Sequence, residues 1–341
     1  MERTEESVST PAAFESFCER IGLSLEDFQR RIVKEVDTSR RELLVLLPRG
    51  NGKTTLMAAL ALHHILTVGR PAVYLAAASR DQARVLYEAA RGFAERLPEG
   101  EVTLRHLELR VPGGHLRVVA SDAPKVHGLT PSLAIIDELH AHRDAELYLA
   151  LRTALLKRPD SRLVTISTAG YGEDSPLSRL RARALGQPSV ERTGALTVAH
   201  GPSLGMLEWA VPDDADIEDP AVGKAANPAS WITEEGLGEQ REAVHELAFR
   251  RYHANQWTVA EHHWLPPGAW QACAGEVDIS PGERVWVGVD IGGERSASAV
   301  VWVNGALPRR LRGLSGRRGR AHGRREGPRA GRDLRGGRGR A

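Results

Sequence analysis

The most informative stretch of the sequence is Glu42 to Leu60, ELLVLLPRGNGKTTLMAAL. It opens with a run of apolar residues, which predicts a buried strand over 42–47, and it ends in a segment of helical composition. Between the two lies PRGNGKTT, residues 48–55. Glycines there let the backbone turn around an anion, and the first N–H groups of the following helix face it. The stretch therefore predicts a phosphate-binding loop.

Two side chains of this loop suit a nucleoside triphosphate bound with Mg²⁺. We expect the Lys53 ammonium to reach the β- and γ-phosphates and the Thr54 hydroxyl to bind Mg²⁺. The usual pattern, GxxxxGK[ST], has a glycine at position 47, where this chain has Leu47. The alternative is a helix N-terminus that contains Gly-Lys-Thr by chance.

A second motif, LAIIDELH over residues 133–140, is an apolar strand that ends in two acids. We expect Asp137 to hold the Mg²⁺ shell and Glu138 to polarise the attacking water. The alternative is a solvated turn after a strand. Together with Lys53, the two acids predict an active site that hydrolyses ATP.

The rest of the pattern predicts an α/β fold. Apolar runs at 72–77, 133–136 and 162–167 read as buried strands, and 54–66 and 79–97 read as helices, the latter capped by Ser79. A hairpin over 104–120 is expected to turn at residues 112–114. Strands that alternate with helices predict a parallel sheet covered on both faces. Residues 180–263 are less regular, with a helix from 234 to about 255, and a new hairpin begins at Val285.

Composition excludes several classes of protein. The acidic, polar start is not a signal peptide, and the longest apolar stretch, near residues 56–66, is too short and too polar to span a bilayer. The two cysteines, Cys18 and Cys273, match no metal-ligand or redox spacing and suit a reducing compartment. We therefore expect a soluble protein in the cytoplasm of a host cell, without a membrane partner.

The net charge of +2 hides an asymmetry. Residues 309–341 hold 13 arginines against one aspartate and one glutamate, a net charge of +11, which leaves −9 for residues 1–308. One interpretation of the tail is a disordered Arg-Gly arm that binds phosphate backbones. The other, which we favour, is GC-rich coding DNA read out of frame or a truncation. In either case the tail lacks the apolar content to pack a core.

These motifs, in this order, resemble the large terminase subunit of tailed bacteriophages over about residues 20–303. Members of that family commonly carry an arginine in the phosphate loop and lack its first glycine. Further similar stretches are AAASRDQA (76–83), KVHGLTPSLAIIDELH (125–140), Asn227-Pro228 and residues 255–257. The resemblance implies a P-loop NTPase sheet of the RecA-like ASCE type, then a linker and the first strands of a ribonuclease-H-like domain.

The resemblance also assigns roles to single residues. It implies catalytic roles for Glu138, Lys53 and Asp137, and an adenine-reading role for Gln29. Ser167, Thr168 and Ala169, which end a buried strand, resemble the family's coupling motif; by themselves they also fit a strand-end turn. The nucleotide-binding residues that it implies are Gln29, Arg49, Gly50, Asn51, Gly52, Lys53, Thr54 and Thr55.

The second domain of such proteins cuts DNA with two divalent metals, Mg²⁺ or Mn²⁺. Its first carboxylate ends the first strand, which corresponds to Asp290 in VWVGVDIGG. The alternative is a strand-end aspartate that opens a Gly-Gly turn. After Val303 only Glu326 and Asp333 are acidic, and neither lies in a strand pattern. One carboxylate cannot hold a metal pair, so we expect an incomplete site without nuclease activity.

The sequence thus predicts five segments: helices over 1–40, an ATPase domain over 41–200, a linker subdomain over 201–280, the start of a nuclease domain over 281–303 and the tail over 304–341. The family's partners are double-stranded DNA, a portal protein, a small terminase subunit and further copies of the chain in a ring.

Other functions also fit parts of the sequence. The DELH segment resembles a helicase box, but the chain runs into a new strand where a second motor domain is expected. GVDIGG (288–293) resembles the phosphate motif of sugar kinases and actin-like ATPases. A fragment that only binds DNA or a portal protein is the non-enzymatic alternative, and ATP turnover that depends on Lys53 discriminates it.

Overall fold

The computed structural model describes residues 10–38, 40–120, 128–172, 174–258, 279–291 and 299–304. Contacts within the chain divide it into two units, Met1–His262 and His263–Ala341. The first unit holds a large α/β sheet with its helices, and the described part of the second is a two-stranded hairpin. No helix among the described residues is both long enough and apolar enough to cross a bilayer.

Ten strands of the first unit form one sheet in the order β3-β4-β5-β2-β6-β7-β1-β10-β9-β8. The six strands from β5 to β10 in this order run parallel to one another. The two strands at each edge pair antiparallel. The strands are β1 (Glu42–Leu46), β2 (Ala72–Ala77), β3 (Thr103–Arg105), β4 (Glu108–Val111), β5 (Gly114–Ala120), β6 (Leu133–Asp137), β7 (Arg162–Ser167), β8 (Ser189–Thr193), β9 (Leu196–His200) and β10 (Leu204–Trp209).

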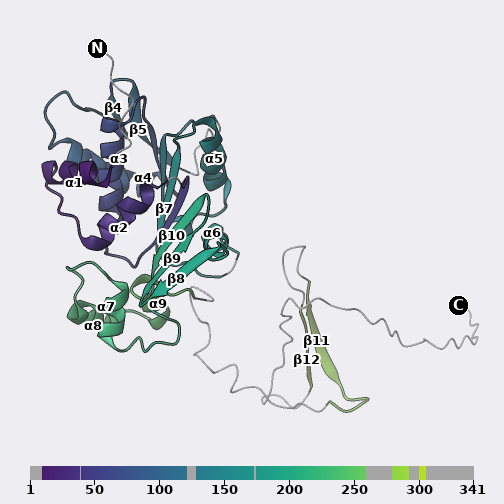
Figure 1. Ribbon diagram of the computed structural model, residues 1–341. Coiled ribbons are helices and arrows are strands. Elements are labelled where there is room, and N and C mark those ends of the chain that lie inside the picture. Colours follow the sequence, from purple (N-terminus) through teal and green to yellow (C-terminus); the bar gives the residue numbers. More distant parts are fainter. Residues whose placement is uncertain are drawn as a thin grey trace, which may run out of the picture. The chain divides into compact units, whose positions relative to one another are not determined.

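Helices cover both faces of this sheet (Figure 1). Helices α1 to α4 pack on one face over a core that includes Phe14, Ile32 and Leu62. Helices α5 and α6 pack on the other face with Leu151 and Leu180. The helices are α1 (Pro11–Arg20), α2 (Asp27–Val36), α3 (Lys53–Thr67), α4 (Arg80–Ala94), α5 (Glu146–Ala154), α6 (Pro176–Leu185), α7 (Pro220–Ala226), α8 (Glu234–Ala243) and α9 (Glu246–Tyr252), with the 3₁₀ turns η1 (Leu139–Ala141) and η2 (Leu155–Lys157).

Most of the elements predicted from apolar runs are present. The strands expected over 42–47, 72–77, 133–136 and 162–167 are β1, β2, β6 and β7, and the parallel, doubly covered sheet is confirmed. The Ser79 hydroxyl accepts a hydrogen bond from the Gln82 N–H at 3.3 Å and so caps α4. The hairpin turns at Gly113, whose φ is +77°, and β3 adds a third strand to it.

The stretch after residue 180 is more regular than predicted. Strand β10 pairs parallel with β1, so the sheet continues past residue 200, where we had expected the linker to begin. Two residues obscured this strand: Gly205, which is unfavourable in strands, and Glu208, which is charged. Glu208 is buried because the Arg181 guanidinium donates two hydrogen bonds to its carboxylate, at 2.7 and 2.9 Å.

Three short helices follow the sheet, and the single helix predicted from 234 to about 255 is in fact two. α8 ends at Ala243, and the extended backbone of Val244 separates it from α9. The helices enclose a small apolar cluster around Ile217 and Phe249. These helices form a separate group beside one end of the sheet (Figure 1).

In the second unit, β11 (Val285–Asp290) and β12 (Ala299–Asn304) form the expected antiparallel hairpin. Asp290 ends β11 opposite Ala299. The glycine pair at 292–293 and the arginine-rich tail beyond 304 lie outside the described residues.

Candidate functional site

The loop between β1 and α3 has the backbone shape of a phosphate-binding loop. β1 ends at Leu46 and α3 begins at Lys53. Gly50 and Gly52 have φ values of +83° and +70°, a region that residues with a Cβ rarely adopt. Gly52 is the N-cap of α3, and no side chain caps the first N–H groups of the helix. These groups are therefore free to bind an anion.

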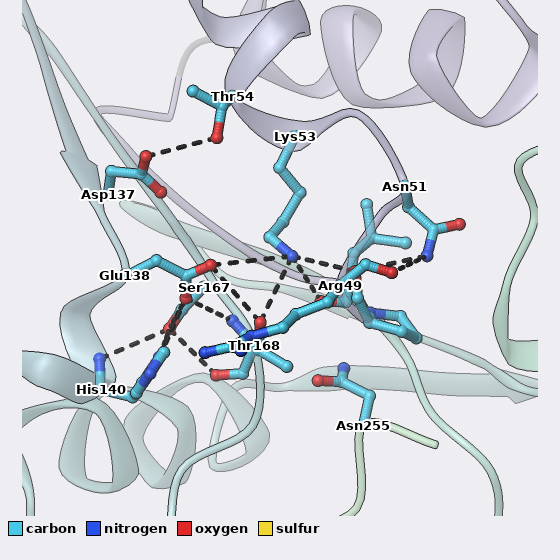
Figure 2. A network of polar contacts seen from close by, with 12 residues as sticks. Arg49, Asn51, Lys53, Thr54, Asp137, Glu138, His140, Ser167, Thr168 and Asn255 are labelled. Atoms are coloured by element: carbon cyan, nitrogen blue, oxygen red, sulfur yellow. Dashed lines mark hydrogen bonds and ion pairs between the residues drawn. The ribbon is translucent and has the colours of Figure 1, made fainter. Parts of the chain in front are cut away.

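Lys53 lies buried behind this loop. Its ammonium donates to the carbonyl oxygens of Leu47 at 2.8 Å and Pro48 at 3.0 Å, and its Nζ lies 4.0 Å from Glu138 Oε1. Figure 2 shows it between the loop and the carboxylate. Burial lowers the pKa of Lys53, and the charges of Glu138 and Asp137 oppose that shift. The site thus provides a cation held by neutral and anionic oxygens.

Asp137 and Thr54 face each other at the end of β6. The Thr54 hydroxyl lies 3.4 Å from Asp137 Oδ2, within hydrogen-bond range, while Asp137 Oδ1 is buried without a hydrogen-bond partner. Burial, reinforced by the charge of Glu138, raises the pKa of Asp137 to about 7. A carboxylate oxygen without a partner beside a hydroxyl is a donor set that fits Mg²⁺, which prefers hard oxygen ligands.

Glu138 is held by several donors. Its backbone has a φ of +49°, and its carboxylate accepts a hydrogen bond from the Thr168 N–H at 3.1 Å and lies 2.9 Å from His140 Nδ1. The Ser167 hydroxyl lies 3.4 Å from the same oxygen. Burial opposes ionisation, but the His140 hydrogen bond and the Lys53 charge outweigh it and hold the pKa of Glu138 at about 2. Glu138 is therefore an anion at neutral pH.

The segment Ser167–Ala169 connects this carboxylate to the residues after the sheet. The Ala169 N–H donates to Asn255 Oδ1 at 2.6 Å, and Asn255 Nδ2 donates to the Trp209 carbonyl at 2.8 Å. Arg251 Nε donates to the Ala169 carbonyl at 3.1 Å. Ser167 and Thr168 thus contact Glu138, while Ala169 contacts the region predicted as the linker.

Arg49 and Asn51, in the phosphate-binding loop, also contact residues that follow the sheet. The Arg49 guanidinium lies 3.7 Å from the centre of the Tyr252 ring, and the Arg49 N–H donates to the Tyr252 carbonyl at 2.8 Å. The buried Asn51 donates to Asn227 Oδ1 at 2.8 Å and accepts from the Ala229 N–H at 3.2 Å. Thr55, the last predicted loop residue, is exposed.

Gln29 lies beside the loop, on the side of α2. Its Oε1 accepts the Glu26 N–H at 3.0 Å as part of a capping box at the start of α2. A Cβ built on Gly52 would lie 3.4 Å from Gln29 Nε2 and 3.3 Å from Trp231 Cζ2. Gln29 therefore lies near the loop, and its role toward adenine stays a prediction.

The structure thus brings together the predicted residues from Gln29 to Ala169, whereas Asp290 belongs to the other unit. Within the parts of the chain that the structure describes, no group of three or more His, Cys, Asp or Glu side chains is placed to hold a metal. The predicted metal at Asp290 stays a prediction.

The contacts that were not predicted include His140 with Glu138, Asn227 with Asn51, and Trp231 with the Gly50 carbonyl at 2.8 Å. His140 was visible in the DELH motif and Asn227 in the Asn-Pro pair, but no local pattern indicated what they contact. Nothing marked Trp231 except its nearness to that pair.

Comparison with known proteins finds similar sequences among large terminase subunits. Residues 37–184 match the family model described as "Terminase large subunit, ATPase domain". The large terminase subunit of Enterobacteria phage HK97 is 25% identical over 304 residues, which cover 82% of this chain and 57% of that protein. Protein YmfN of Escherichia coli K12 is 28% identical over 153 residues, 43% of this chain and 32% of that protein. The chain spans about half or less of the length of these relatives.

Solved structures share the fold. The crystal structure of the HK97 large terminase has a TM-score of 0.63 at 23% identity and covers 89% of this chain and 67% of that one. The large terminase ATPase domain of Thermus phage P74-26 has a TM-score of 0.53 at 20% identity, covering 71% of this chain and 97% of that one. At these identities the likeness concerns the fold, and it agrees with the RecA-like α/β class expected from the sequence.

Proposed function

We propose that this chain hydrolyses ATP to move double-stranded DNA into a viral capsid, because residues 37–184 match the family model of the large terminase subunit's ATPase domain. The observation that carries the hydrolysis is the meeting of the two motifs. Thr54 lies 3.4 Å from Asp137, and Lys53 lies 4.0 Å from Glu138. The members of these two pairs are 83 and 85 positions apart in the chain, and they meet beside a loop shaped for phosphates.

In this proposal the loop binds the phosphates of ATP. The N–H groups at the start of α3 and the αL glycines Gly50 and Gly52 surround them. Lys53 exchanges its bonds to the Leu47 and Pro48 carbonyls for the β- and γ-phosphates. A buried ammonium gains from that exchange because two full negative charges replace two neutral carbonyl dipoles.

Asp137 and Thr54 would hold Mg²⁺. The donor set fits, since Asp137 Oδ1 is buried without a hydrogen-bond partner and the Thr54 hydroxyl lies beside the other oxygen. When bound, the ion supplies charge that stabilises the phosphate oxygens during transfer. Because the pKa of Asp137 is about 7 without the ion, the bound cation would favour the ionised carboxylate at neutral pH.

Glu138 would orient and polarise the attacking water. A carboxylate with a pKa of about 2 is a weak proton acceptor, so the hydrogen bonds from Thr168 and His140 weaken its basicity. We propose that Glu138 leaves at least one of these donors before hydrolysis. Its carboxylate then becomes both more basic and free to bind water.

The same contacts give a route for coupling. A carboxylate that releases Thr168 also releases the strand end at Ala169, which is bonded to Asn255 and Arg251. We propose that this route passes the change to α9 and the residues that follow it up to Asn255, which lie in the predicted linker, and from there to bound DNA. The relatives' name is the support for DNA packaging, and portal, small subunit and ring contacts belong to this proposal, as does a site of action in the host cytoplasm.

We further propose that β11 and β12 begin a ribonuclease-H-like domain, with Asp290 as its first metal-binding carboxylate. The support is the antiparallel hairpin itself and the position of Asp290 at the end of β11. Metal-dependent DNA cutting that is lost in Asp290→Ala would support this assignment and overturn the expectation that the site is incomplete. Cutting that Asp290→Ala retains would contradict the assignment.

The decisive experiment is ATP turnover in the wild type, Lys53→Ala and Lys34→Ala. Lys34 is an exposed lysine of α2 and serves as the control. We expect turnover that Lys53→Ala abolishes and Lys34→Ala retains. A wild type that binds ATP without turning it over would favour the binding fragment instead.

A further inference from the structure

The site has a γ-phosphate end and, opposite it, an end for the nucleoside. This inference rests on the proposed binding of ATP. Glu138, Asp137 and Thr168 mark where the γ-phosphate and the attacking water would lie, behind Lys53 (Figure 2). The ribose and base must therefore extend away from these residues, past the loop and the first turn of α3.

Trp231 lies on that outer side of the loop. Its indole N–H donates to the Gly50 carbonyl at 2.8 Å, and a Cβ built on Gly52 would come within 3.3 Å of its Cζ2 atom. Yet 53% of the residue is exposed to solvent. One edge of the ring is thus fixed against the phosphate loop, while much of its apolar surface is uncovered.

Backbone hydrogen bonds hold the chain around Trp231 in place. The neighbouring Ser230 N–H donates to Glu26 at 3.0 Å, and the Ala229 N–H donates to Asn51 at 3.2 Å. These bonds join the segment 227–232 to both α2 and the loop. The indole is therefore held in place, and stacking on a ring that is already ordered costs less conformational entropy.

Beside this segment is room for a base. An open cavity of about 500 Å³ is lined by Glu26, Asp27, Phe28, Arg30 and Pro228. Glu26 is also the partner of Ser230, and Gln29 lies with Trp231 against Gly52. The cavity thus lies between the start of α2 and the segment that carries Trp231.

We propose that Trp231 is the stacking surface for the nucleobase of the bound nucleotide. The indole receives the flat face of the purine, and the hydrogen bond from its N–H to the Gly50 carbonyl holds the ring in position. Stacking depends on an aromatic face rather than on the pattern of donors and acceptors, so Trp231 sets affinity for a purine without choosing between adenine and guanine. Selectivity for adenine over guanine would then depend on Gln29.

Binding of ADP, GDP and inorganic tripolyphosphate to the full chain tests this role. In Trp231→Ala we expect ADP and GDP to bind about tenfold more weakly, as loss of one base–aromatic stack predicts. Tripolyphosphate, which has no base, should bind as in the wild type. Trp231→Phe keeps an aromatic face and should retain most of the nucleotide affinity. The control is Trp286→Ala, which removes a tryptophan of similar exposure, 56%, from the hairpin of the other unit.

Two results would overturn the proposal. If Trp231→Ala weakens the binding of ADP and of tripolyphosphate equally, Trp231 acts through the phosphate loop. If Trp231→Ala leaves the affinity for ADP unchanged, Trp231 does not stack on the base. Fluorescence gives a second measurement that needs no destabilising variant. ADP should change the tryptophan emission of the wild type, and Trp231→Phe should lose most of that change.

Failure of the proposed function gives a different result. A wild type that binds neither ADP nor tripolyphosphate contradicts nucleotide binding altogether. A wild type that binds both, with a Trp231→Ala variant that is indistinguishable from it, contradicts only the stacking role.

Discussion

Replacing Asp137 by asparagine should stabilise the protein in the absence of nucleotide and metal. Burial, reinforced by the charge of Glu138, raises the pKa of Asp137 from 3.8 to about 7. Between these pH values the folded protein keeps a proton that the unfolded chain releases. The free energy of unfolding therefore falls as pH rises through this window, and the loss is complete above about pH 7.

The size of the effect follows from the shift. Each pKa unit corresponds to about 1.4 kcal/mol, so the full penalty of ionised Asp137 is on the order of 4 kcal/mol. Asparagine cannot ionise and escapes it. The stability advantage of Asp137→Asn over the wild type should grow by about 3 kcal/mol between pH 4.5 and 8.5, and then remain constant. Glu138 does not blur this window, because its lowered pKa, about 2, affects stability only below pH 4.5.

Urea unfolding followed by circular dichroism, at several pH values and with EDTA present, measures this difference. The control is Asp214→Asn, which removes an exposed carboxylate of the same unit. A difference between Asp137→Asn and the wild type that does not change with pH would refute the electrostatic reasoning. Addition of Mg²⁺ at pH 8 should stabilise the wild type and leave Asp137→Asn unchanged.

Three further perturbations test other contacts of the site. A double-mutant cycle of Asn51→Ala and Asn227→Ala, measured by urea unfolding, should give a coupling energy of about 1 kcal/mol for their buried hydrogen bond, whereas additive effects would contradict that bond. In His140→Ala the pKa of Glu138 should rise, because its strongest hydrogen-bond donor is lost; a ¹³C titration of labelled glutamate measures it, and an unchanged pKa would refute the contact. Gly52→Ala should lower the free energy of unfolding by about 1–2 kcal/mol, because its φ of +70° strains a residue with a Cβ, and equal stability would show that the loop can relax.

Much of the sheet could be predicted because its central strands are buried on both faces. β1 and β6 are apolar apart from one terminal acid each, and such runs need no periodicity to be recognised. β10 is equally buried, but its Gly205 and Glu208 break the pattern. Its charge is compensated by Arg181, 27 positions earlier in the chain, and no local signal announces such a pair.

The motifs of the site could be predicted, but their connections could not. Lys53 and Asp137 follow apolar strands, where functional residues of parallel sheets gather. His140 and Ser167 both contact Glu138 because β6 and β7 are neighbours in the sheet. The order of strands in a sheet cannot be predicted from the local sequence. The contact between Asn51 and Asn227 likewise depends on how a distant segment folds back.

The missing first glycine of the loop has a physical reason in this fold. The Leu47 N–H donates to the Ser167 carbonyl at 3.1 Å, so position 47 continues the pairing of β1 with β7. Its side chain is fully buried in the core beneath α3, and its carbonyl accepts from Lys53. A position that extends a strand needs no left-handed backbone, and the core at this point has space for a leucine side chain. The two bends of the loop lie at Gly50 and Gly52, where glycine is present. The departure at Leu47 therefore adds apolar contact where the loop leaves the sheet, and it leaves the phosphate-binding part of the loop unchanged.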